Sequence, residues 1–144
     1  MDYYKTLETT NRSLFMTSAN TSLAHRNPAD VSAIGLKVFF NITKEWGLST
    51  QQERNLLGDP ARSTFYKWRQ ADGPTIPRDT LERISYVMGV YKALRILFPT
   101  LDQANQWPKK ANSHFGGETA LSVMLKGSVM NLADVRRYLD AMRG

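Results

Sequence analysis

Residues 49–70 read STQQERNLLGDPARSTFYKWRQ, and this stretch decides the expected fold. Residues 51–57 are predicted to form a short helix that turns Leu56 and Leu57 inward, and Gly58-Asp59-Pro60 is predicted to end it. A second helix is expected over residues 61–70, because proline is tolerated in the first turn of a helix. Two short helices joined by a three-residue turn that contains glycine are typical of a helix-turn-helix motif.

The second of these helices separates apolar from basic side chains. At about 100° per residue, Ala61, Phe65 and Trp68 share one face, which is predicted to be core. No acidic residue occurs between residues 62 and 70. Side chains of the kinds that hydrogen-bond to base edges and phosphates occupy the remaining positions: Arg62, Ser63, Thr64, Tyr66, Lys67, Arg69 and Gln70. The pattern favours DNA binding, and a basic solvated face with no such role is the alternative.

A longer helix is predicted before this motif. Asp30 is expected to cap it and Gly47 to end it, with an apolar stripe between them. Ser49 and Thr50 are expected to begin the next helix, and Glu53 is placed to complete a Thr-x-x-Glu capping box. The stripe consists of Ile34, Val38, Phe39 and Ile42.

Residues 1–27 differ in composition from the rest of the chain. Residues 9–27 are rich in Thr, Ser and Asn and contain few apolar side chains. Such composition cannot bury enough apolar surface to fix a structure, so a flexible arm is expected here. Both a tail without a role in the folded state and a segment that contacts a partner remain open.

The longest helix is predicted over residues 77–98. Its apolar residues recur at alternating spacings of three and four, which indicates a buried helical stripe. A stripe this wide is expected to pack against more than one neighbour, or to form the surface of a dimer. The stripe consists of Ile84, Val87, Tyr91, Leu94 and Phe98, widened by Leu81, Met88 and Leu97.

Shorter elements are expected after Pro99. A helical turn over residues 102–107, a loop over residues 112–117 and a helix over residues 118–126 precede a final helix capped by Asn131. That last helix is expected to bury Leu132, Val135, Leu139 and Met142. No stretch alternates cleanly enough for a strand, so the class is all-α. We expect a helix-turn-helix bundle over residues 28–98 and a small helical domain over residues 99–144.

Composition excludes several classes of protein. The chain has 144 residues, no cysteine and a net charge of +6, which favours a polyanionic partner and gives neither a disulfide framework nor a thiolate metal site. No apolar run reaches the roughly 20 residues that cross a membrane, and no secretion signal begins the chain, so a cytoplasmic protein is expected. His25 and His114 lack zinc-site spacing, and no phosphate-binding or dinucleotide-binding glycine motif occurs. Neither an enzyme nor a bound cofactor or metal is expected.

Residues 104–144 follow an ordered pattern: a tryptophan, a loop with asparagine and glycines, a short helix, a glycine stop and a terminal helix. The residues that form it are Ala104, Trp107, Asn112, Phe115, Gly116, Gly117, Leu121, Met124, Gly127, Val135, Tyr138, Leu139 and Gly144. The pattern resembles the toxin-binding domain of the Xre/MbcA/ParS antitoxin family, and the preceding helices look like the Xre-type helix-turn-helix of that family. Pro108 departs from it, because the family's helix continues at this position.

The resemblance implies a partner and a mode of inhibition. The partner would be a RES-domain toxin, an enzyme that consumes NAD, and the antitoxin would block its active site with the C-terminal end. Carried over by position, this assigns toxin contact to Arg136, Arg137, Tyr138, Arg143 and Gly144. The resemblance also implies a homodimer that binds operator DNA and represses its own operon.

Trp107 and Phe115 are the other expected toxin contacts. They bring large apolar area to a segment too small for its own core, so they must pack on the long helix or on a partner. A helical cap without a partner is the alternative. Two other functions stay open for the whole chain: a stand-alone dimeric helix-turn-helix repressor and a small adaptor whose basic face is incidental.

Overall fold

The computed structural model describes residues 27–70 and 75–144, and within them the fold is all-α, as predicted. The predicted arm lies outside the described residues except for Asn27. The elements are α3 (Pro28–Glu45), α4 (Thr50–Leu56), α5 (Arg62–Arg69), α6 (Arg78–Leu97), α7 (Leu101–Gln106), the 3₁₀ turns η1 (Trp107–Lys109) and η2 (Ser113–Phe115), α8 (Ala120–Met124) and α9 (Val129–Arg143). None of the described helices is both long and apolar enough to cross a bilayer.

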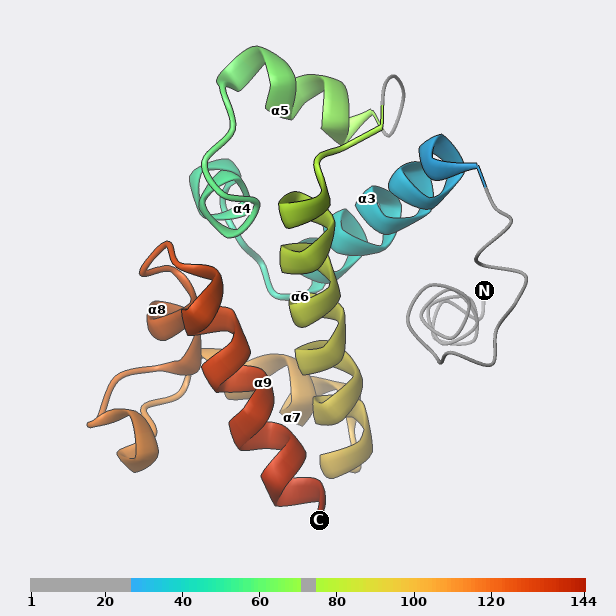
Figure 1. Ribbon diagram of the computed structural model, residues 1–144. Coiled ribbons are helices and arrows are strands. Elements are labelled where there is room, and N and C mark those ends of the chain that lie inside the picture. The colour runs from blue at the N-terminus through green and yellow to red at the C-terminus, as the bar shows by residue number, and fades with distance from the viewer. Residues whose placement is uncertain (1–26, 71–74) are drawn as a thin grey trace.

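Helix α6 is the central element of the molecule (Figure 1). Helix α3 packs against it in the amino-terminal part of the fold, and α9 packs along it in the carboxyl-terminal part. Helix α4 lies level with the amino-terminal end of α6 and α5 lies beyond that end (Figure 1), whereas α7 packs against α6 and α8 against α9. Helix α5, the second helix of the helix-turn-helix, and the carboxyl end of α9 therefore lie at opposite ends of the molecule.

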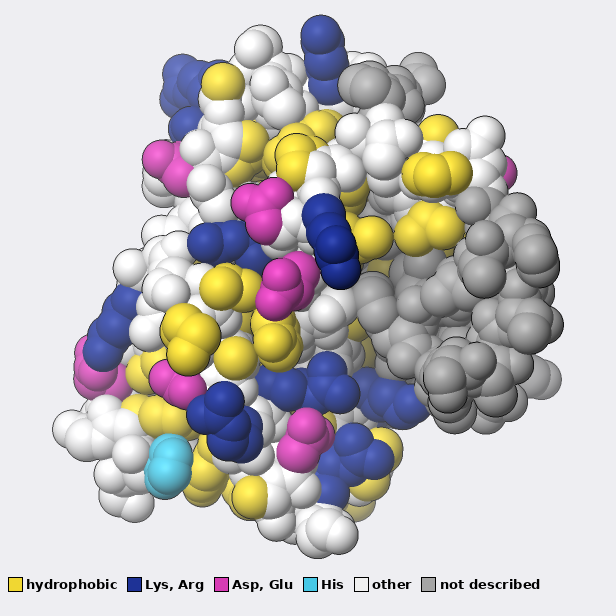
Figure 2. Space-filling model, viewed as in Figure 1, with side chains coloured by type: hydrophobic (Ala, Val, Ile, Leu, Met, Phe, Trp, Pro, Cys, Tyr) yellow, Lys and Arg dark blue, Asp and Glu magenta, His cyan; other side chains and the backbone are white. Residues whose placement is uncertain are grey.

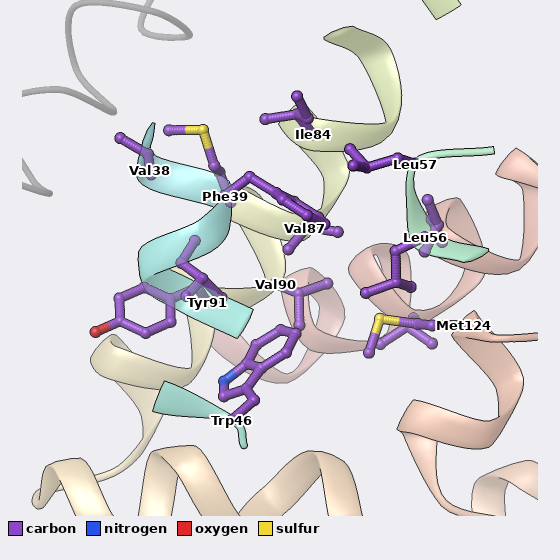
Figure 3. Close-up of a cluster of buried hydrophobic side chains, with 14 of the residues drawn as sticks. Val38, Phe39, Trp46, Leu56, Leu57, Ile84, Val87, Val90, Tyr91 and Met124 are labelled. Atoms are coloured by element: carbon purple, nitrogen blue, oxygen red, sulfur yellow. The ribbon is translucent and has the colours of Figure 1, made fainter. Parts of the chain in front are cut away.

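One hydrophobic core runs through both predicted domains. Met124 of α8 lies with Leu56 of α4 in the same buried cluster as Phe39 of α3 and Val87 of α6 (Figure 3). Because α8 contributes to the core around the helix-turn-helix, the carboxyl-terminal part of the chain is packed on it rather than tethered to it.

The predicted stripe of α6 is confirmed as buried at its centre. Ile84, Val87, Tyr91 and Leu94 are all at most 6% exposed. Burial extends beyond the stripe, because Val90 and its neighbours also face other helices of the same chain. The stripe therefore forms the core of this chain and is not available as a dimer surface.

The predicted cap of the first described helix is wrong. Asn27, not Asp30, caps α3, because its side chain accepts a hydrogen bond from the Ala29 amide at 2.9 Å. Pro28 follows at the first helical position, where its missing N–H costs nothing and its fixed φ suits a helix. The helix consequently begins three residues earlier than the position after Asp30.

The cap of α4 also lies one residue before the predicted one. Ser49 Oγ accepts from the Gln52 amide at 3.2 Å, and Gln52 Oε1 accepts from the Ser49 amide at 2.9 Å. Two capping boxes overlap in this sequence, Ser-x-x-Gln and Thr-x-x-Glu, and the earlier one forms. Glu53 is therefore not part of a cap, and its side chain points into the protein.

Three further expectations are corrected in the carboxyl-terminal part and at α5. Ser128 caps α9 and Asn131 completes its capping box, so Asn131 is not the cap. Met142 is 46% exposed rather than buried, because it lies on the outward side of the last turn of α9. Ala61 is the exposed N-cap of α5 and not part of the core. Pro108 is accommodated in the 3₁₀ turn η1, where it is buried.

Candidate functional site

Helix α5 is anchored by its aromatic side chains. Phe65 is fully buried and Trp68 is 7% exposed, which confirms the predicted core face at these two residues but not at Ala61. The ring of Phe40 on α3 meets the ring of Phe65 edge-to-face, with centroids 5.7 Å apart. Aromatic pairs of this geometry contribute both apolar area and directional packing, so this pair helps to fix how α5 lies on α3.

The turn before α5 has backbone angles that few residues adopt. Gly58 has a φ of 94° and Asp59 a φ of 58°, so two consecutive residues have positive φ angles. Arg54 holds the turn from α4, donating from Nη2 to the Pro60 carbonyl at 3.0 Å and lying 3.4 Å from the Asp59 carboxylate. Glycine tolerates such angles and aspartate does so more readily than most residues, which explains this sequence at the turn.

The outward face of α5 presents polar and basic side chains to solvent. Tyr66 is 50% exposed, and Thr64 is half-buried beside the core. Figure 2 shows Lys and Arg side chains at the edge of the molecule occupied by α5. Of the predicted DNA-binding residues, those exposed on this face are Arg62, Ser63, Tyr66, Lys67 and Gln70.

Arg69 is placed differently from the other predicted DNA-binding residues. Its Nη2 donates to Glu53 Oε1, and Thr43 Oγ1 donates to Glu53 Oε2 at 2.5 Å. The guanidinium carbon of Arg69 also lies 4.9 Å from the ring centroid of Phe40. Arg69 is 41% exposed at its side chain, yet its charge is directed at Glu53, which is 5% exposed there. This ion pair ties the end of α5 to α4 and α3.

Glu53 is one of two residues at these sites that the sequence pattern does not predict, and His114 is the other. Glu53 was assigned to a helix cap, where a carboxylate in the first turn is common. Its position three residues before Leu56 and four before Leu57 was the available signal, because residues at those spacings share a helix face. A carboxylate on the inward face of α4 needs a cation, and Arg69 supplies it.

A cluster of aromatic rings forms the second surface, on the carboxyl-terminal part of the chain. Tyr138 of α9 is at its centre, with ring centroids 6.2 Å from Trp107, 5.4 Å from Phe115 and 4.1 Å from His114. Trp107, Phe115 and Tyr138 were predicted as toxin contacts, and the structure brings all three together. His114 was not in that prediction, and its place in the cluster depends on the turn η2, which only the fold brings against α9.

Two of the arginines of α9 predicted to contact a toxin, Arg136 and Arg137, have different surroundings. Arg136 lies across α6 at Gly89, and its Nε donates to Asp140 at 3.1 Å. Arg137 is 70% exposed and its Nη1 donates to Asp134 at 3.1 Å. Arg136 therefore contributes to helix packing, whereas Arg137 lies on the surface.

The end of α9 is exposed. All of residues 141–144 are exposed to solvent, and Arg143 Nη1 lies 3.7 Å from Asp140 Oδ1. Arg143 and Gly144 thus lie together at the carboxyl end of α9, and Tyr138, the one residue that α9 contributes to the aromatic cluster, lies more than one turn before them.

Two hydrogen bonds join α4 and α6 to the turn between α8 and α9. Asn55 Nδ2 on α4 donates to the Leu125 carbonyl at 2.9 Å, and Arg83 Nη2 on α6 donates to the Gly127 carbonyl at 2.9 Å. Both acceptors belong to the turn between α8 and α9. The helix-turn-helix is therefore in direct contact with the segment that begins α9.

The fold and these surfaces define a helix-turn-helix protein that carries a compact helical module on its carboxyl side. Residues 25–89 match the antitoxin Xre-like helix-turn-helix domain, and residues 93–144 match the antitoxin Xre/MbcA/ParS C-terminal toxin-binding domain. The chain is also 45% identical over 127 residues to the uncharacterized protein y4oB of Sinorhizobium fredii, covering 88% of this chain and 94% of that protein. The chain belongs to the Xre/MbcA/ParS antitoxin family.

Proposed function

We propose that this antitoxin inhibits a RES-domain toxin that consumes NAD, by placing the end of α9 at the entrance of the toxin's active site. It also binds operator DNA through α5 as a homodimer and thereby represses its own operon. The observation that carries the proposal is that α5 and the carboxyl end of α9 lie at opposite ends of the molecule (Figure 1). With this separation, one chain contacts DNA and toxin at the same time.

The DNA-binding part rests on the exposed face of α5. Arg62 and Lys67 supply cations for phosphates, and Ser63 and Gln70 supply neutral donors and acceptors for base edges. The face of one eight-residue helix makes few base contacts. A two-fold pair would read a palindrome with half-sites about 34 Å apart, which is the physical reason for proposing a dimer.

The inhibitory part rests on the exposure and charge of the carboxyl end of α9. Residues 141–144 are all exposed, so this end of α9 is open to contact by a partner. Arg143 brings a cation with five donors, which pairs with acidic groups at the entrance of a pocket. Arg137 and Tyr138 lie on the side of the same helix and are proposed to contact the toxin next to the cleft.

Arg143→Glu tests the inhibitory part. The product of the reading frame beside this chain's gene is assayed as the toxin, and its consumption of NAD is measured with increasing amounts of each variant. Arg143→Glu is expected to inhibit at least about 10-fold less well than the wild-type chain, as for loss of one charged contact. Lys110→Glu is the matched control, because Lys110 is exposed and lies outside α9. Equal inhibition by both variants would contradict the proposal.

A stand-alone dimeric repressor is the other function that these surfaces allow. In that case residues 99–144 would serve the fold or a dimer and no toxin would bind. The match of residues 93–144 to a toxin-binding domain favours the antitoxin. DNA binding without any effect on the neighbouring gene product would favour the repressor.

A further inference from the structure

An open groove lies between the turn η2 and the outer side of α9. Its volume is about 500 Å³, which is the size of sites that hold several side chains or a small ligand. Rings and small apolar side chains form much of its surface: His114, Phe115, Val123, Tyr138 and Ala141. The groove therefore combines an aromatic wall with room for apolar groups.

The charges around the groove are paired with one another. Lys126 Nζ lies 3.0 Å from Glu118 Oε2, and Arg137 Nη1 lies 3.1 Å from Asp134 Oδ1. These four side chains also line the groove, and their charges sum to zero. A charged occupant would have to compete with an existing ion pair, so a neutral occupant is favoured by charge complementarity.

The aromatic wall is fixed before any partner binds. Tyr138 is stacked on His114 with the ring planes 25° apart, and Phe115 meets Tyr138 edge-to-face. The turn that carries His114 and Phe115 is closed by two hydrogen bonds to Asn112. The His114 amide donates to Asn112 Oδ1, and the Gly117 amide donates to the Asn112 carbonyl. A preformed apolar surface costs little ordering entropy on binding, which is the property of a recognition site.

Several hydrophobic side chains are exposed on the side of the molecule formed by α8 and α9 (Figure 2). Figure 2 shows hydrophobic side chains between Lys, Arg, Asp and Glu side chains over the region of α8 and α9. An apolar centre with a charged rim is the anatomy of a protein–protein interface. Every residue that lines the groove also lies within residues 93–144, which match a toxin-binding domain.

We propose that this groove receives a neutral, hydrophobic segment of the toxin, with an aromatic side chain packed against the rings of His114 and Tyr138. The inference rests on the proposed function and adds a second contact to it: the groove holds the toxin, and the end of α9 blocks its active site. Binding is therefore carried by the groove that η2, α8 and α9 form, and inhibition by the end of α9.

Ala141→Trp tests this division of roles. Ala141 is exposed and lines the groove, so an indole at this position fills it without disturbing the core. Met130→Trp is the matched control, because Met130 is 60% exposed on the same helix and does not line the groove. The full chain and both variants are titrated against the product of the neighbouring reading frame by calorimetry, with circular dichroism melting to verify the fold.

Ala141→Trp is expected to raise the Kd for the toxin about 30-fold, as for loss of a central interface contact, whereas Met130→Trp leaves it within about 3-fold. Both variants are expected to melt at the wild-type temperature. Deletion of residues 142–144, which leaves the groove intact, is expected to abolish inhibition while the toxin still binds.

Three results would overturn the inference. If Ala141→Trp binds the toxin as tightly as the wild-type chain, the groove is not a toxin contact, and the proposed function stands without it. If that variant alters self-association and leaves toxin affinity unchanged, a second copy of this chain occupies the groove. If the wild-type chain does not bind the neighbouring product at all, the proposed function and the groove assignment fail together.

Discussion

Glu53 illustrates how a single side chain positions the helix proposed to contact DNA. It is a buried carboxylate that accepts hydrogen bonds from Thr43 on α3 and from Arg69 on α5. A buried charge is tolerated only when it is paired and hydrogen-bonded, so the three helices are held in one arrangement by this cluster. Arg69 thereby serves the geometry of α5, although it was predicted as a DNA contact.

Glu53→Ala is expected to reduce the free energy of unfolding by about 2 kcal/mol, less than for a fully buried pair because Arg69 is partly exposed. The variant leaves the Arg69 guanidinium without its carboxylate, whereas the Thr43 hydroxyl can still donate to the Phe40 carbonyl at 3.1 Å. Glu82→Ala, at an exposed position on α6, is the control and is expected to change stability by less than about 0.5 kcal/mol. Urea denaturation followed by circular dichroism measures both. A loss at Glu53 no larger than that at Glu82 would show that the cluster does not stabilise the fold.

Residues of this kind are hard to predict because local motifs compete. Glu53 completes a Thr-x-x-Glu pattern and also lies on the inward face of α4, and only the packing of α3 and α5 decides between the two. Phe65 and Trp68 were predicted correctly, because aromatic residues at a spacing of three in a helix otherwise polar leave little choice of face.

Among the helices, the positions of glycine and proline predict where most helices lie, but the residues that cap them are predicted less well. Gly58 and Pro60 delimit the helix-turn-helix as predicted, because their backbone preferences are local. Caps at Asn27, Ser49 and Ser128 each lie one or more residues before the predicted ones. Each of these sites has two residues able to cap a helix within four positions, so side-chain chemistry alone does not select one.

The contact between α6 and α9 depends on a glycine inside a helix. A methyl group added to Gly89 would lie 1.7 Å from Arg136 Nη1, so the arginine must move. The sequence shows a glycine in the middle of the longest helix. It does not show that a side chain 47 positions later requires the space.

A double-mutant cycle tests this contact. Gly89→Ala is expected to destabilise the wild-type chain, because it displaces Arg136 from its site over α6. In an Arg136→Ala background the same change is expected to stabilise by about 0.5–1 kcal/mol, since alanine is the better helix former. Thermal unfolding of the four proteins gives the coupling energy. Additive effects of the two substitutions would contradict the packing described for Arg136.

In the molecule as a whole, one shared core connects α5 at one end with the carboxyl end of α9 at the other. Met124 reaches the core around α4, and Asn55 bonds to the turn before α9, so the helix-turn-helix and the toxin-binding domain form a continuous body. The class and family were predictable, because both depend on the order of breakers and apolar positions along the chain. The groove was not, because it forms where η2 meets α9.

Lys67→Ala tests the proposed DNA surface. It is expected to weaken binding to DNA from upstream of this chain's gene about equally for different sequences, and to lower the slope of log affinity against log salt by about 1. Lys110→Ala, a surface lysine outside α5, is expected to leave both quantities unchanged. Fluorescence anisotropy across a range of salt concentrations gives them. An identical slope for wild type and Lys67→Ala would show that Lys67 does not contact a phosphate.

Co-expression in bacteria shows whether this chain neutralises a toxin. The neighbouring reading frame is induced with and without this chain while growth and cellular NAD are followed. We predict that the neighbour alone arrests growth and lowers NAD, and that this chain restores both and co-purifies with it. If the product of the neighbouring reading frame does not affect growth, or if this chain neither binds nor counteracts it, the toxin-neutralising function is contradicted. A DNA-binding repressor would then remain.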